Sequence, residues 1–223
     1  MYTITPSLPA QTFEEISSLA KKLDGIAPML QVDIVDGVFV PLRSWPFTNH
    51  AYDVHEELAK LSSLPQTLPL EIDCMVMHPE QYLDTLCALS AKSVIIHMRS
   101  TTAYHHIIMH ARLHGYKIGF AITNDDDVRL LAPYICEIDF VQVMGIAHVG
   151  TQGQPFDRRT LTTLTQLRLA YPKLTLVVDG AVNADTILTL RDAGATRFAP
   201  GSYIAKATDP VIAYKHLCVL LNI

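Results

Sequence analysis

The feature that most constrains the fold is a strict alternation of short apolar runs with longer amphipathic segments along all 223 residues. The apolar runs have the length and β-branched content of buried strands, and the longer segments repeat apolar residues at helical spacing. The expected strands cover residues 3–8, 29–35, 70–76, 93–98, 117–122, 138–144, 174–180 and 196–201. The expected helices cover residues 13–23, 50–61, 79–90, 104–113, 126–134, 157–170 and 184–194, with a last helix ending near Leu221.

This alternation predicts an α/β fold with a parallel sheet, and eight repeats predict that the sheet closes into a (β/α)8 TIM barrel. No linker or low-complexity segment interrupts the pattern, so we expect a single domain over residues 1–223. A doubly wound open sheet is the alternative, but it lacks an obvious G-x-G-x-x-G motif after the first expected strand.

Composition excludes several classes of function. The chain is 49% hydrophobic and 17% charged with a formal net charge of −5, and it has no block of Lys and Arg, which argues against a nucleic-acid partner. No apolar run reaches the length of a membrane span, and the start, MYTITPSLPAQ, lacks the basic region of a signal peptide. We therefore expect a cytoplasmic protein without a membrane partner. Its four scattered cysteines are expected to be free thiols rather than metal ligands.

Acidic side chains gather where the expected strands end. Gln31 and Asp33 share one face of the second strand, Asp73 and Met75 share one face of the third, and Asp179 ends the seventh. Catalytic groups of such barrels lie at the carboxyl ends of the strands, so three strands direct carboxylates toward one mouth. An unpaired buried charge costs several kcal/mol, on the order given for desolvation, so we expect these acids to share a wet cavity.

Two acids that face each other across a cavity can move a proton from one face of a carbon atom to the other. One acid removes the proton and the other returns it, which inverts a stereocentre beside a carbonyl if the enediolate between the steps is stabilised. Asp33 and Asp179 lie on strands that are expected on opposite sides of the barrel axis. A divalent cation among the acids would offset their repulsion.

Glycines mark an expected phosphate site in the late loops of the barrel. Gly180, Gly201 and Ser202 follow the last two strands, where backbone N–H groups frequently bind phosphate in this fold. Gly153, in the loop after the sixth strand, would permit another close backbone approach.

These segments resemble the ribulose-phosphate 3-epimerase family in order and over nearly the whole chain. QVDIVDGVFVP resembles the family's H-x-D-x-M-D-G-x-F-V-P, and EIDCMVMHPE resembles its D-V-H-L-M-V-x-x-P-E. TPSL, MGIAHVGTQGQPF, VDGAVN and APGS resemble four further motifs, although the second of these is one residue longer than in the family. The resemblance implies a ribulose-phosphate-binding barrel that acts as an epimerase on a small phosphorylated sugar.

By this resemblance the catalytic acids are Asp33 and Asp179, and the metal ligands fall at Gln31, Asp33, Asp73 and Asp179. The family has histidines at two of these positions, which Gln31 and Asp73 replace, so the set offers oxygen atoms only. The implied cofactor is one divalent cation, Mg²⁺, Mn²⁺ or Zn²⁺, and an oxygen-only set favours the harder ions. Because both histidines are replaced, a metal-free site is the alternative.

The resemblance also implies which residues contact the substrate. Ser7, Met75 and Met144 match family positions that line the site, and Ala181 replaces a glycine of the phosphate site. With the glycines and Ser202 of the late loops, the expected substrate-binding and phosphate-binding residues are Ser7, Met75, Met144, Gly153, Gly180, Ala181, Gly201 and Ser202.

The expected reaction is the conversion of ribulose 5-phosphate to xylulose 5-phosphate through Asp33 and Asp179. A 3-epimerase for another ketose phosphate, such as allulose 6-phosphate, and a non-catalytic phosphosugar-binding relative are the alternatives. A decarboxylase resembling hexulose-phosphate synthase ranks last, because EIDCMVMH contains no lysine. Family members often self-associate, so the resemblance also implies a homo-oligomer.

Other polar residues are expected to be structural. Asp36 is expected to hold the loop after the second strand, and His97 to be a hydrogen-bonded barrel histidine. His106, His110 and His114 recur at a spacing that can bind zinc, but no Glu accompanies them as in H-E-x-x-H. We expect these three histidines to form a solvated stripe on an outer helix.

Overall fold

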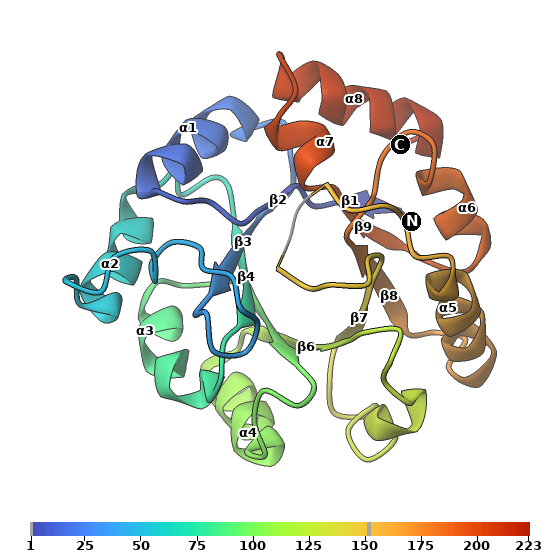
Figure 1. The fold of residues 1–223 in the computed structure, drawn as a ribbon, viewed down its shortest axis with the longest axis horizontal. Helices are drawn as coiled ribbons and strands as arrows, with labels where there is room; N and C mark the ends of the chain where they lie inside the picture. The colour runs from blue at the N-terminus through green and yellow to red at the C-terminus, as the bar shows by residue number, and fades with distance from the viewer. Residues whose placement is uncertain (1, 151–152) are drawn as a thin grey trace.

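The computed structural model describes residues 2–150 and 153–223, and it confirms the predicted α/β barrel (Figure 1). All strand pairs are parallel, in the order β1-β9-β8-β7-β6-β5-β4-β3-β2. The strands are β1 (Thr3–Ile4), β2 (Ser7–Leu8), β3 (Leu30–Val35), β4 (Leu70–Met75), β5 (Ser93–His97), β6 (Lys117–Ile122), β7 (Phe140–Met144), β8 (Thr175–Asp179) and β9 (Arg197–Ala199).

The first expected strand closes the barrel, but as two short strands. β1 pairs with β9 and β2 pairs with β3, so the segment 3–8 joins both ends of the sheet. Pro6 lies between the two short strands and has no N–H to donate to a ladder. Its carbonyl still accepts a hydrogen bond from the N–H of Gln31 at 2.8 Å, which holds the N-terminal segment against β3.

Helices surround the strands, as the outer ring in Figure 1 shows. The α-helices are α1 (Phe13–Leu23), α2 (Val54–Ala59), α3 (Leu83–Ala88), α4 (Tyr104–His114), α5 (Arg159–Ala170), α6 (Ile187–Asp192), α7 (Ser202–Ala205) and α8 (Pro210–Leu221). Short 3₁₀ helices are η1 (Lys60–Ser63), η2 (Pro79–Tyr82) and η3 (Val128–Leu131). α1 begins as predicted, with the Thr12 side chain accepting from the N–H of Glu15.

Several expected helices are shorter than their patterns indicated. The helix expected over 50–61 begins only at Val54, because the side chain of Asp53 caps it there. The helix expected over 126–134 is only the 3₁₀ turn η3, and Pro133 lies just beyond it, where it cannot continue a helical ladder. The helix expected over 79–90 begins with the 3₁₀ turn η2, and the one expected over 184–194 is regular only over α6.

A buried ion pair lies inside the barrel, away from the carboxyl ends of the strands. Nη2 of Arg197 donates to both carboxylate oxygens of Glu71 at 3.0 and 2.8 Å, and Ser93 Oγ donates to Glu71 Oε2 at 2.6 Å. The Arg197 guanidinium also lies 4.1 Å from the ring centroid of Phe140. That ring fills the space beside Gly119, where an added Cβ would come within 2.1 Å of it. The glycine in β6 is therefore required by packing.

Among the described residues, no helix combines the length and the apolar character that a bilayer crossing demands.

Candidate active site

Three carboxylates meet at the carboxyl ends of β3, β4 and β8. One oxygen atom from each of Asp33, Asp73 and Asp179 lies within 4.8 Å of the other two. The sheet register places Asp33 beside Asp73 on neighbouring strands, and β8 approaches from across the barrel (Figure 1). All three side chains are buried. The structure therefore brings together the three acids that the sequence places at strand ends.

The amide of Gln31 bridges two of these acids. Its Nε2 donates to Asp33 Oδ1 at 2.8 Å and to Asp179 Oδ2 at 3.2 Å. Ser7 Oγ donates a longer hydrogen bond, 3.4 Å, to the other oxygen of Asp179. In this arrangement Gln31 presents its nitrogen to the carboxylates, whereas a metal ligand would present its oxygen. Oε1 of Gln31 is buried and has no hydrogen-bond partner among the described residues.

Asp73 is held by two donors from neighbouring strands. His97 Nε2 lies 2.9 Å from Asp73 Oδ1, and Gln142 Nε2 donates to Asp73 Oδ2 at 2.7 Å. The expectation that His97 is a hydrogen-bonded barrel histidine is thus confirmed. No role was predicted for Gln142, although its alternation with Met144 on β7 places it on the inward face.

Burial and mutual repulsion govern the protonation of the acid pair. The pKa of Asp33 is raised well above its usual value, first by burial and then by the charges of Asp179 and Asp73. Burial and the charge of Asp73 raise the pKa of Asp179 to about 7. The hydrogen bonds from Gln31 oppose both shifts, because they stabilise the ionised carboxylates. Near neutral pH the pair therefore retains a proton.

A cavity opens beside Asp33 and Asp179, and every residue expected to bind substrate lines it. The lining includes Ser7, Asp33, Met75, Met144, Gly153, Asp179, Gly180, Ala181, Gly201 and Ser202. Pro9, Ile146, Gly150 and Val182 also line the cavity. No role was predicted for them, although the last three lie within the segments MGIAHVGTQGQPF and VDGAVN. Thr151 and Gln152, in the loop whose motif resembles the family's substrate loop, lie outside the described residues.

The turn after β8 needs an unusual backbone. Gly180 has φ +98°, and an added Cβ would lie 2.9 Å from a side-chain carbon of Ile146. Ala181 follows with φ +53°, a left-handed conformation that disfavours any residue with a Cβ. This conformation explains why a glycine suits position 181, and Ala181 stores a small strain there.

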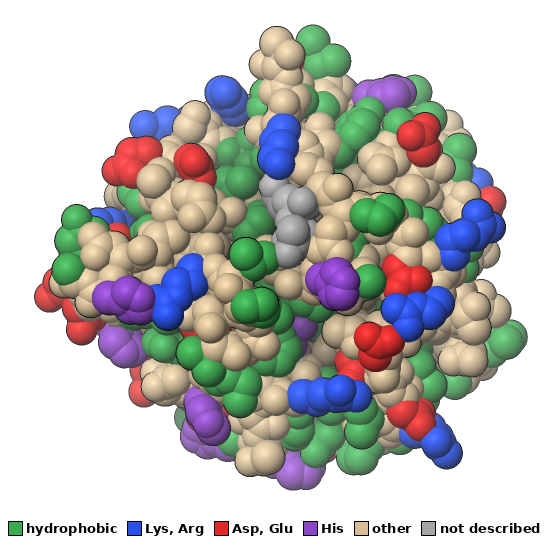
Figure 2. Space-filling model, viewed as in Figure 1, with side chains coloured by type: hydrophobic (Ala, Val, Ile, Leu, Met, Phe, Trp, Pro, Cys, Tyr) green, Lys and Arg blue, Asp and Glu red, His purple; other side chains and the backbone are tan. Residues whose placement is uncertain are grey.

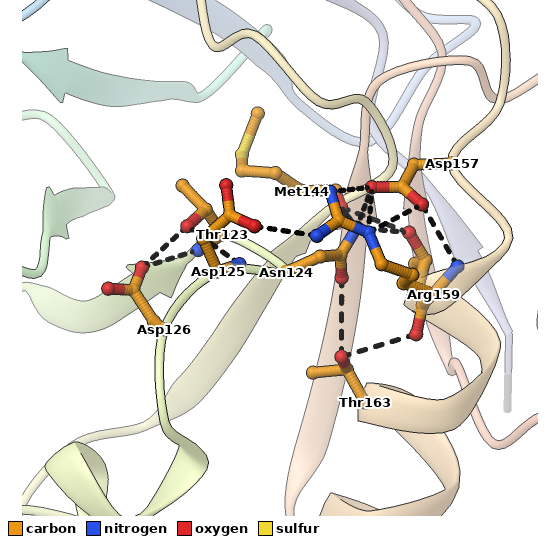
Figure 3. Close-up of polar contacts among 9 residues, drawn as sticks. Thr123, Asn124, Asp125, Asp126, Met144, Asp157, Arg159 and Thr163 are labelled. Atoms are coloured by element: carbon orange, nitrogen blue, oxygen red, sulfur yellow. Dashed lines mark hydrogen bonds and ion pairs between the residues drawn. The ribbon is translucent and has the colours of Figure 1, made fainter.

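A polar cluster fixes the end of β7 beside the cavity (Figure 3). Asn124 Nδ2 and Thr160 Oγ1 donate to the carbonyl of Met144 at 3.2 and 3.1 Å. Asp157 accepts from Asn124 at 3.0 Å and forms an ion pair with Arg159 at 2.7 Å. These contacts join the loop after β6 to the start of α5, and so hold Met144 against the cavity.

The loop after β3 is held by Asp36, as expected. Its Oδ1 accepts from the N–H groups of Val38 and Phe39 at 2.7 and 2.9 Å, and its Oδ2 accepts from the N–H of Met77 at 2.8 Å. Exposed Val38 and Leu42 belong to this loop. Figure 2 shows hydrophobic side chains next to the centre of this face, while most charged side chains lie nearer its edge.

The donor set at the mouth fits a hard divalent cation. Asp33, Asp73 and Asp179 supply three carboxylates, whereas Gln31 and Gln142 face them through their amide nitrogens and are not ligands in this arrangement. Oxygen-rich sets suit Mg²⁺, Mn²⁺ and Ca²⁺ better than Zn²⁺.

Comparison with known proteins identifies the family. The model of the ribulose-phosphate 3 epimerase family matches residues 3–205. The ribulose-phosphate 3-epimerase of Schizosaccharomyces pombe is 30% identical over 211 residues, which cover 93% of this chain and 88% of that protein. The ribulose-phosphate 3-epimerase of Bacillus subtilis is 24% identical over 216 residues, 94% of each chain.

Solved structures agree on the fold. A mutant tryptophan synthase alpha-subunit from Pyrococcus furiosus superposes with a TM-score of 0.74 at 16% identity, covering 100% of both chains. At that identity the likeness concerns the barrel alone. With the family match over most of its length, the chain belongs to the ribulose-phosphate 3 epimerase family and is an isomerase that acts on a phosphorylated sugar.

Proposed function

We propose that this protein inverts C3 of a phosphorylated ketose by a two-base mechanism, with ribulose 5-phosphate and xylulose 5-phosphate as the substrate pair. The observation that carries the proposal is the placement of Asp33 and Asp179, two buried carboxyls from strands across the barrel that line one cavity. Their raised pKa values keep a proton on the pair near neutral pH. A two-base epimerase needs this state, with one acid ionised and the other protonated.

Deprotonation and reprotonation take place on opposite faces of C3. The ionised carboxylate removes the C3 proton, and the electron pair of the C–H bond moves toward the C2 carbonyl to give an enediolate. The protonated carboxyl on the opposite face delivers its proton to C3, which yields the inverted centre. The two acids exchange their protonation states, and the reverse reaction uses them in the opposite order.

Gln31 is assigned the role of holding the two acids in position. Its Nε2 donates to one oxygen of each carboxylate, which stabilises whichever acid is ionised. A divalent cation held by Asp33, Asp73 and Asp179 would supply positive charge that offsets the carboxylates and the negative charge developing on the substrate oxygens. His97 and Gln142 keep Asp73 in place.

The remaining lining residues suit the rest of the sugar phosphate. Met75 and Met144 present thioether side chains to the cavity beside the acids, and would keep water from the reacting carbon. No Lys or Arg lines the described part of the cavity, so the phosphate is assigned to backbone N–H groups at Gly180, Ala181, Gly201 and Ser202.

Solvent exchange tests the proposal. The protein is incubated with ribulose 5-phosphate in D₂O, with and without Mn²⁺, and proton NMR follows the C3 signal. We expect xylulose 5-phosphate that carries deuterium at C3. Asp185→Asn removes an exposed carboxyl that follows β8, the strand that carries Asp179. It should exchange and epimerise ribulose 5-phosphate as the wild type does.

The alternatives give different results in the same assay. Exchange with allulose 6-phosphate but not with ribulose 5-phosphate would reassign the substrate while retaining the mechanism. Binding of ribulose 5-phosphate by calorimetry without exchange of either substrate would overturn catalysis and leave a phosphosugar-binding protein.

A further inference from the structure

A second group of metal-ligating side chains lies on the outside of the barrel, between α3 and α4, which are neighbours in Figure 1. One ligand atom from each of Asp84, His110 and His114 lies within 4.8 Å of the other two. Asp84 belongs to α3, and the two histidines lie one turn apart on α4. The sequence pattern showed the histidines without an acid, and the fold supplies the acid from the neighbouring helix.

The geometry of this exterior cluster is close to that of a metal site. Asp84 Oδ1 lies 3.0 Å from His110 Nε2, and the ring centroids of His110 and His114 are 4.3 Å apart. Histidines at i and i+4 project from one face of a helix, so their ring nitrogens can converge on one ion. Asp84 is 96% exposed at its side chain, and His114 is also exposed, so both can adjust to bond lengths of about 2 Å.

A partner behind His110 orients its ring. Its Nδ1 lies 2.9 Å from the hydroxyl oxygen of Tyr116, a residue that is itself buried. The side chain of His110 is only 11% exposed, so its orientation is largely fixed before any ligand binds. Metal-binding histidines in proteins usually make such a hydrogen bond with the ring nitrogen that does not bind the metal. In His110 the hydrogen bond at Nδ1 leaves Nε2 directed at Asp84.

We propose that Asp84, His110 and His114 bind one divalent transition-metal ion of the zinc class, with water completing its coordination. Two imidazole nitrogens and one carboxylate oxygen are ligands that Zn²⁺, Co²⁺ and Ni²⁺ accept readily. The acids at the barrel mouth offer oxygen only, so the two places select different ions. Binding joins α3 to α4 and replaces the hydrogen bond between Asp84 and His110. This site is independent of the proposed epimerase activity.

Spectroscopy with Co²⁺, followed by competition with Zn²⁺, tests the site. The purified protein is stripped of metal and titrated with Co²⁺, and the visible absorption reports nitrogen-containing coordination. We expect one nitrogen-coordinated Co²⁺ per chain and loss of that absorption on addition of Zn²⁺. His114→Gln and Asp84→Asn should each weaken binding at least tenfold. Tyr116→Phe should weaken it about tenfold, which is typical for loss of an outer hydrogen bond.

The matched control is His105→Gln, which removes an exposed histidine of the same helix outside the cluster. It should bind as the wild type does. Zn²⁺ should also raise the melting temperature of the wild type and of His105→Gln by more than that of His114→Gln, because only the folded protein binds the ion and His114→Gln retains only the acids at the barrel mouth. Wild-type affinity and stoichiometry in both His114→Gln and Asp84→Asn would overturn the proposal, as would the absence of any Co²⁺ signal in the wild type.

Discussion

The amide of Gln31 offers a sharp test of the acid pair, because one side chain contacts both carboxylates. Gln31→Met keeps the length of the side chain and removes the two hydrogen bonds from Nε2, at 2.8 Å to Asp33 and 3.2 Å to Asp179. These bonds favour the ionised carboxylates and lower the pKa of each. Their loss must therefore raise the pKa of the acid that acts as the base.

The magnitude follows from the strength of one such bond. A hydrogen bond to a charged group contributes roughly 1.5 to 3 kcal/mol, and one pKa unit corresponds to about 1.4 kcal/mol. The pKa of Asp179, about 7 in the wild type, should thus rise by roughly 1 to 2 units in Gln31→Met. Since the base must be ionised, and about half of it is ionised at pH 7 in the wild type, kcat/KM at pH 7 should fall by roughly 5-fold to 50-fold.

The assay is the pH dependence of kcat/KM for ribulose 5-phosphate between pH 5 and pH 10. The acidic limb should move to higher pH in Gln31→Met, and the activity should recover in part near pH 9. Gln166→Met, which changes an exposed glutamine on α5, should leave the profile unchanged. An acidic limb that stays in place in Gln31→Met, or moves to lower pH, would refute the role given to this amide.

Three further predictions concern stability. Asp179 has a raised pKa in the folded state, so the stability linked to its protonated form is complete at low pH and is lost as pH rises through about 7. Without divalent cations, the free energy of unfolding of the wild type should therefore fall by about 1 kcal/mol per pH unit between about pH 4 and pH 7, as measured by urea unfolding. Asp179→Asn should lack this fall, and equal slopes in the two proteins would contradict the linkage. Ala181→Gly should stabilise the fold by about 0.5 to 1 kcal/mol by relieving φ +53°, whereas Ala170→Gly at the exposed end of α5 should destabilise it; a loss of stability in Ala181→Gly would show that the turn is unstrained. Arg197→Met should cost about 3 to 5 kcal/mol, because it leaves Glu71 buried without its cation, and Glu71→Leu in the same chain should recover much of this loss; an unchanged urea midpoint in the single variant would contradict the pairing.

The features that the sequence predicts correctly are those that depend on local pattern. The period of the apolar runs predicted the order of strands and helices, and the ends of the strands placed Asp33, Asp73 and Asp179 at one mouth. Pro6 splits the first strand, and Pro133 lies beyond the short turn η3, so two errors in the expected elements lie beside prolines. Local pattern alone overestimated the length of helices that the fold shortens.

Contacts between distant segments could not be predicted in this way. The orientation of the Gln31 amide depends on its hydrogen bond to Asp179, 148 positions away in the sequence. The orientation of Asp73 depends on the hydrogen bond that it accepts from Gln142, 69 positions away. The same is true of Asp84, which reaches His110 only because α3 and α4 pack together. In each case the residue type was visible in the sequence, and its partner was set by the closure of the barrel.

The transfer of a proton between two faces of C3 is tested most directly by exchange half-reactions in the variants Asp33→Asn and Asp179→Asn. Each variant retains one acid, so each should exchange the C3 proton of only one epimer with D₂O, and neither should interconvert ribulose 5-phosphate and xylulose 5-phosphate. We expect the two variants to select opposite epimers. Exchange of the same epimer by both, or full epimerisation by either, would contradict a mechanism in which Asp33 and Asp179 serve opposite faces.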